Sequence, residues 1–246
     1  MIEIYIIIFI LGNIIGSFLN VCICRIPENE SVVFPPSHCP KCGYKIKWYD
    51  NIPIISYFIL LRGKCRKCKE KISIQYPIIE MLTGIIFVVI FYKYQLTFLT
   101  IKFWIYGSIL LTLAIIDLKT YMLPNRLTFS LVILGFLLSF IDPRITLFHS
   151  FIGAAVYNFP FLILYIFGQE VLKKDVMGFG DVKLGMGIGA FLGYTSFIEF
   201  YMFFMLSFTV GAVISLILMA LKIKNRKDMI PFGPFIALSG LIMLFI

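Results

Sequence analysis

The chain has 246 residues, of which 60% are hydrophobic and only 14% charged, a composition too apolar for a water-soluble domain. Apolar runs near twenty residues recur along it, the length that a helix needs to cross a hydrocarbon layer about 30 Å thick. The formal net charge of +9 does not indicate nucleic acid as a partner, because basic loops beside membrane helices account for it. The expected fold class is an all-α polytopic membrane protein in contact with lipid.

Eight apolar segments are predicted to form transmembrane helices, and one large polar loop follows the first of them. The segments lie at residues 4–24, 78–94, 98–116, 127–141, 147–168, 182–198, 200–221 and 230–246. Three domains are expected from this pattern: a first transmembrane helix at 1–24, a small loop domain at 25–77, and a membrane domain at 78–246.

The basic residues predict which side of the membrane each loop faces. Only Lys93, Lys102 and Arg144, of the 22 lysines and arginines, lie outside the loops that follow the first, third, fifth and seventh segments. Lysine and arginine concentrate in cytosolic loops. We therefore expect the N-terminus outside and the 25–77 loop in the cytosol.

Four cysteines in this loop form two CxxC pairs, which predict a structural zinc site. Cys39 and Cys42 are separated from Cys65 and Cys68 by 22 residues, a spacing typical of a zinc ribbon. Four thiolates complete a tetrahedron and leave no open position for catalysis. Two disulfides are the alternative, which a reducing cytosol disfavours. Cys22 and Cys24 are expected to be small helix residues and not ligands.

Two aspartates stand at the cytosolic edge of apolar segments. Asp117 ends the third segment, and Asp181 closes the tetrad Gly178-Phe179-Gly180-Asp181 before the sixth. A carboxylate at this depth is costly and is by default a candidate functional group. Taken singly, Asp181 could be a helix N-cap and Asp117 a helix end in interfacial water. Together at one membrane face, they favour a catalytic pair.

Two close carboxylates share one proton, so that one acts as base and the other as acid. The ionised member would take a proton from water, while the protonated member would hydrogen-bond a scissile carbonyl and assist departure of the amine. Neither a metal nor a covalent intermediate is required. Gly178 and Gly180 would give the backbone room to approach an extended peptide.

The ordered motifs of the whole chain resemble those of the type IV prepilin peptidase family. They include Gly16-Ser17-Phe18-Leu19-Asn20-Val21, the paired CxxC motifs, Asp117-Leu118-Lys119, Gly178-Phe179-Gly180-Asp181-Val182-Lys183-Leu184 and Pro231-Phe232-Gly233-Pro234. The resemblance implies a bacterial inner-membrane aspartic endopeptidase that removes the leader from type IV prepilins or pseudopilins on the cytosolic side. It aligns Asp117 and Asp181 with the catalytic pair, and Gly178, Gly180 and Lys183 with the supporting motif. Asn125 stands where the family often has an acidic residue.

The resemblance also implies methylation of the new N-terminus with S-adenosylmethionine as methyl donor. Gly63 and Lys64 match family positions implicated in methyl transfer, and Glu80 is a further candidate. No nucleotide-binding fingerprint is visible in the sequence, so a peptidase without this second activity stays an alternative. A proton- or ion-coupled transporter is a rival of another class, because it too uses intramembrane carboxylates and broken helices. It should show an inverted repeat, which the sequence lacks.

Overall fold

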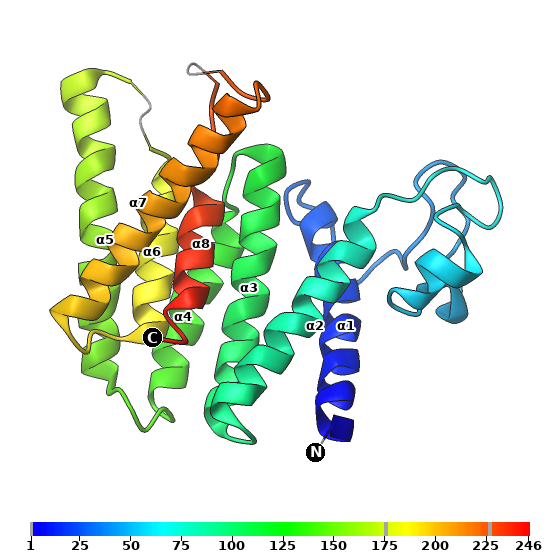
Figure 1. The fold of residues 1–246 in the computed structure, drawn as a ribbon, viewed down its shortest axis with the longest axis horizontal. Helices are drawn as coiled ribbons and strands as arrows, with labels where there is room; N and C mark the ends of the chain where they lie inside the picture. The colour runs from blue at the N-terminus through cyan, green and yellow to red at the C-terminus, as the bar shows by residue number, and fades with distance from the viewer. Residues whose placement is uncertain (1, 175–176, 226–227) are drawn as a thin grey trace. The chain divides into compact units, whose positions relative to one another are not determined.

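The structure is a computed structural model that describes residues 2–174, 177–225 and 228–246. Within these residues it is helical, with only two isolated β-bridges and no extended strand. The helices are α1 (Ile2–Arg25), α2 (Gln75–Tyr94), α3 (Phe98–Thr120), α4 (Asn125–Ser139), α5 (Leu147–Ile166), α6 (Phe179–Leu192), α7 (Phe197–Ala220) and α8 (Gly233–Ile242) (Figure 1). Each predicted apolar segment therefore forms a helix.

Five helical stretches are long and apolar enough to cross a membrane. They are α1, α2, α3, α7, and α5 continued through the π-helical turn Phe167–Leu172. Helices α4 and α8 are apolar but shorter, and α6 has only 14 residues. At 1.5 Å per residue, α6 is about 21 Å long, less than the hydrocarbon thickness of about 30 Å. The structure thus identifies a multi-pass membrane protein, but it does not confirm the count of eight spans.

The chain divides into two compact units, Met1–Ser108 and Ile109–Ile246, with the boundary inside α3. In the first unit, α1 and α2 pack side by side, and the loop between them carries the short helical turns Trp48–Asn51 and Ser56–Leu60 (Figure 1). Glycines allow this close approach. A Cβ added at Gly12 would lie 2.7 Å from the Cα of Gly84, and one at Gly16 would lie 2.7 Å from the Cα of Glu80.

In the second unit, α6 packs against both α4 and α5 (Figure 1). Its glycines form the contact surfaces. Gly187 lies against Leu131 of α4, Gly185 lies against Phe161 of α5, and Gly189 meets the backbone of Gly153. These small residues give α6 a face for close packing against both neighbours. It holds the first turn of α6, which carries Asp181, firmly against its neighbours.

Candidate functional site

Asp117 lies near the C-terminal end of α3, where its side chain is buried. The residue is 5% exposed, and its Oδ2 accepts a hydrogen bond of 3.0 Å from the backbone N–H of Gly233, the first residue of α8. The positive end of a helix dipole favours a carboxylate at this position. Only glycine fits there, because a Cβ on Gly233 would lie 2.6 Å from Oδ2 of Asp117.

The start of α8 is held in place by aromatic rings. The ring of Phe232, the residue before Gly233, lies 5.0 Å from the ring of Phe208 in α7 and 6.5 Å from that of Phe161 in α5. Pro234 then occupies the first turn, where a missing N–H costs nothing. The motif Pro231-Phe232-Gly233-Pro234 therefore positions one backbone donor against Asp117. The motif was visible in the sequence, but the contact of Gly233 with Asp117 could not be predicted from it.

Asp181 lies in the first turn of α6 and is 7% exposed. The N-cap of this helix is Gly178. The alternative that Asp181 serves only as the N-cap is therefore wrong. The backbone at Gly178 is extended, and its carbonyl accepts a hydrogen bond of 3.1 Å from the N–H of Asp181. A Cβ on Gly178 would lie 3.4 Å from Oδ2 of Asp181. The tetrad thus turns the carboxylate inward at the beginning of the helix.

The structure brings the two aspartates into one buried region of the second unit. They are within coulombic range of each other. Leu123 connects their surroundings, since Cβ atoms added at Gly180 and Gly233 would lie 2.9 and 3.4 Å from its side chain. Across the described residues, neither aspartate forms a salt bridge with a lysine or an arginine. Two buried, uncompensated carboxylates in proximity are the arrangement that shares one proton.

Lys183 lies at the contact between α4 and α6. Its Nζ donates a hydrogen bond of 2.6 Å to Oδ1 of Asn125 and lies 4.8 Å from the ring centroid of Phe179. The lysine therefore links the first turns of α4 and α6. An acidic residue in place of Asn125 would make this link an ion pair.

The four cysteines predicted as metal ligands come together in the first unit. Their sulfurs all lie within 4.8 Å of one another, with Cys39 and Cys68 at 3.7 Å and Cys42 and Cys65 at 3.9 Å. A zinc–sulfur bond of about 2.3 Å in a tetrahedron requires sulfurs about 3.8 Å apart. A disulfide requires about 2.05 Å, so none of these pairs is bonded. The donor set and its spacing fit a tetrahedral metal ion. Cys22 and Cys24 lie outside this group.

The two CxxC turns have the same backbone pattern, as expected for a ribbon-like site. The N–H of Cys39 bonds the carbonyl of Tyr44 and that of Cys65 bonds the carbonyl of Glu70. The carbonyls of the same two cysteines accept bonds from Gly43 and Lys69. In the second turn, a hydrogen bond from the backbone N–H of Cys68 lowers the pKa of the Cys65 thiol to about 7. At Cys65 a thiolate, the form that binds metal, is thereby favoured, whereas burial and the neighbouring sulfurs raise the pKa of the Cys68 thiol to about 12.

Of the residues predicted for methyl transfer, Gly63 and Lys64 lie in the cysteine loop and Glu80 lies outside it. Gly63 has a φ of +69°, and Lys64 begins the second turn through a bridge with Lys71. Glu80 lies in α2, where its Oε2 accepts a hydrogen bond of 2.8 Å from the N–H of Ile54. Their assignment to methyl transfer stays a prediction.

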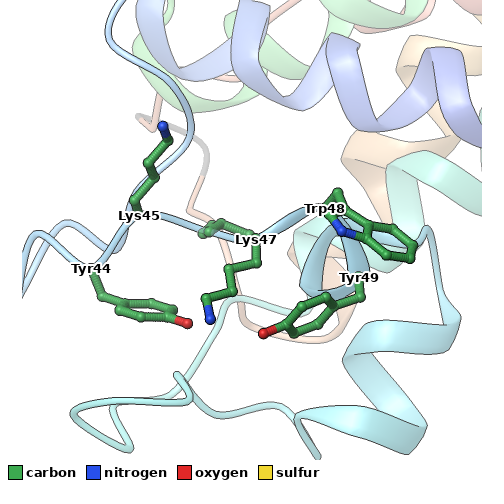
Figure 2. A pocket seen from close by; sticks show the side chains of 6 residues that line it. Tyr44, Lys45, Lys47, Trp48 and Tyr49 are labelled. Carbon is green, nitrogen blue, oxygen red and sulfur yellow. The ribbon is translucent and has the colours of Figure 1, made fainter.

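An aromatic and basic segment after the first CxxC turn was not singled out from the sequence. Tyr44, Lys45, Lys47, Trp48 and Tyr49 line an open groove of about 470 Å³ (Figure 2). Nζ of Lys47 lies 5.6 Å from the ring centroid of Tyr49, and Cζ of Arg66 lies 5.5 Å from the same ring. Arg66 also pairs with buried Asp50, so these contacts fasten the segment to the second CxxC turn.

Fold and site together define a class: multi-pass helical membrane proteins with two buried aspartates in the second unit and a four-cysteine loop after the first helix. Comparison with known proteins gives the family. The bacterial peptidase A24 N-terminal domain matches residues 10–94, and the type IV leader peptidase family matches residues 104–216. The chain belongs to the type IV leader peptidase family and is an enzyme, a peptidase.

Relatives named prepilin leader peptidase/N-methyltransferase cover most of the chain. The protein from Vibrio cholerae is 37% identical over 98% of this chain and 97% of its own length. The protein from Neisseria gonorrhoeae is 34% identical over 95% of this chain and 87% of its own length. A relative from Myxococcus xanthus is 34% identical over 86% of this chain, which spans 62% of that protein. No solved structure gave a significant match.

Proposed function

We propose that the protein removes the leader peptide from type IV prepilins or pseudopilins, with Asp117 and Asp181 as its catalytic pair. The observation that carries this proposal is the burial of both carboxylates in one region without a cationic partner among the described residues. Such a site has a stability cost that a purely structural role does not explain. The names of the relatives supply the substrate class.

In the proposed reaction, the ionised aspartate takes a proton from a water molecule, and the water oxygen forms a bond to the scissile carbonyl carbon. The protonated aspartate donates a hydrogen bond to the carbonyl oxygen. When the tetrahedral intermediate collapses, the C–N bond breaks and the amine takes the proton that the first aspartate had removed from water. The N–H of Gly233 stabilises one ionised carboxylate, which favours Asp117 as the ionised member of the pair.

We also propose that a zinc ion held by Cys39, Cys42, Cys65 and Cys68 is structural. Bound there, it would supply folding free energy to a loop that has few buried apolar residues. The same chain would methylate the new N-terminus with S-adenosylmethionine, with Gly63, Lys64 and Glu80 as its candidate residues. Residues 1–24, 25–77 and 78–246 would then serve as anchor, cysteine domain and peptidase domain.

For the topology, we propose eight spans in the bacterial inner membrane, with the cysteine loop and both aspartates at the cytosolic side. The distribution of basic residues supports this orientation. The short helices α4, α6 and α8 would cross where the bilayer thins or where neighbouring helices surround them. Labelling of single cysteines introduced into successive loops, from each side of the membrane, tests the count and the orientation.

The test of the proposed function is incubation of the purified protein with a prepilin, followed by mass measurement of the products with and without S-adenosylmethionine. Loss of the leader supports the peptidase. A mature chain that is heavier by about 14 Da, the mass of one added CH₂, supports methylation. An intact prepilin with folded protein would exclude the proposed function.

A further inference from the structure

The first unit contains a cavity of about 950 Å³ that the peptidase mechanism does not use. It is bounded by the C-terminal end of α1, the start of α2 and the loop that holds the cysteines. This volume is at the upper end of the range for small-molecule sites, about 300–1,000 Å³. Gly63 and Lys64 do not line it, whereas Glu80 does.

Glu80 is the buried carboxylate of this cavity. It is 7% exposed, and it accepts a hydrogen bond of 2.8 Å from the N–H of Ile54. The close packing at Gly16 sets Ser17 beside it. An ionised carboxylate has about four acceptor positions, so the hydrogen bond from Ile54 leaves capacity for a ligand.

No cationic side chain neutralises Glu80 in the part of the chain that the structure describes. Two other buried carboxylates do have a cationic partner: Asp50 forms a salt bridge with Arg66, and Asp142 forms one with Arg144. A buried carboxylate without a cation is costly, and a bound cation would offset the cost.

The backbone that contacts Glu80 is strained. Ile54 has a φ of +60°, which a β-branched residue rarely adopts. Its N–H is directed at Oε2 of Glu80 in this conformation. Backbone strain of this kind is concentrated at ligand sites, where surrounding contacts hold it.

We propose that this cavity binds the free α-ammonium group of the processed pilin, with Glu80 as its counter-charge and proton acceptor. The inference rests on the proposed function, since a peptide with a new N-terminus is its substrate. Phe18, Ile52, Ile54 and Ile72 supply apolar walls for the first side chain of that peptide. Tyr57, whose hydroxyl bonds the carbonyl of Ile72, forms a further wall.

Glu80 prepares the amine for methylation. An ammonium ion has no free electron pair, so its proton passes first to the Glu80 carboxylate and gives a neutral amine and a carboxylic acid. The amine pair then forms a C–N bond to the methyl carbon of a sulfonium donor, and the S–CH₃ pair returns to sulfur. A methylammonium ion and a neutral thioether result.

This assignment gives Gly63 a positioning role. A Cβ at Gly63 would lie 3.3 Å from the hydroxyl oxygen of Tyr57, and its positive φ would be strained with any side chain. A substitution there would move a wall of the cavity without touching Glu80.

The experiment measures binding of a synthetic peptide with a large apolar first residue, with its N-terminus either free or acetylated, to the full chain in detergent without a methyl donor. The wild-type protein should bind the free amine about tenfold or more tightly than the acetylated peptide, as expected for a charge-assisted bond. Glu80→Gln should abolish this preference, whereas Glu80→Asp should retain part of it.

Glu28→Gln is the matched control, because Glu28 is an exposed glutamate of the same unit that does not line the cavity. It should keep the preference. Equal preference in Glu80→Gln and wild type would overturn the proposal, as would equal binding of both peptides by the wild type. So would a Glu80-dependent preference for S-adenosylmethionine over S-adenosylhomocysteine with no effect on the amine. Leader cleavage by the same wild-type preparation separates these results from failure of the proposed function.

Discussion

The backbone N–H of Gly233 lies 3.0 Å from Oδ2 of Asp117, although 116 residues separate them in sequence. The contact joins the end of α3 to the beginning of α8. It is the only hydrogen bond that the structure gives to this carboxylate within the described residues, and it comes from the main chain. A side chain added at position 233 would therefore displace the Asp117 carboxylate sterically, while the backbone donor stays in place.

Gly233→Ala should reduce leader cleavage by about a hundredfold, since a misplacement near 1 Å costs that much in catalysis. The added carbon would lie 2.6 Å from the Asp117 carboxylate, which must move. Gly178→Ala places its carbon at an ordinary 3.4 Å from Asp181 and should have a smaller effect. Steady-state cleavage of a prepilin by the two variants measures the difference. Equal activities would contradict the role assigned to Gly233.

Asp117→Asn and Asp181→Asn should each lower cleavage by about 10⁴-fold or more, and the double variant should be little worse, because members of one catalytic unit are not additive. Each asparagine leaves a single ionisable carboxylate in this buried region and relieves the repulsion between the two, so the melting temperature should stay equal or rise.

Asp142→Asn is the matched control for the two aspartates. Asp142 is as buried as they are but is paired with Arg144. Its substitution should lower the melting temperature and leave catalysis by the folded protein intact. Full cleavage by Asp117→Asn or Asp181→Asn, measured by product mass, would remove the catalytic assignment.

The sequence predicted the eight helices, the four-cysteine group and the meeting of the two aspartates, because charge and cysteine spacing are local features with few physical explanations. It overestimated the length of the sixth helix, which ends at Leu192 and not at 198. Gly193 adopts a φ of +74° and stops it. The Gly233 contact and the cavity at Glu80 depend on the packing of distant segments, which no local pattern contains.

Asn125→Asp should stabilise the protein slightly. It would replace the hydrogen bond from Lys183 with an ion pair at the partly exposed junction of α4 and α6. Pairs of this kind contribute about 0.2–1 kcal/mol. Thermal unfolding at low and high salt measures the gain, which should shrink as salt rises. A salt-independent gain, or a loss of stability, would show that Lys183 does not form the pair.

The cysteine group should bind close to one zinc ion per chain, and Cys39→Ser with Cys42→Ser should remove it. Serine oxygen is a poor ligand beside two thiolates, and two remaining sulfurs cannot close the tetrahedron. Metal content of the purified protein, measured by elemental analysis, is the readout. Cys24→Ser changes an exposed cysteine outside the group and should leave the zinc content unchanged.

A strong chelator should release the metal from the wild type and expose the 25–77 loop to protease, since metal binding supplies much of its folding free energy. Wild-type protein that is metal-free and equally protease-resistant would exclude a structural zinc site.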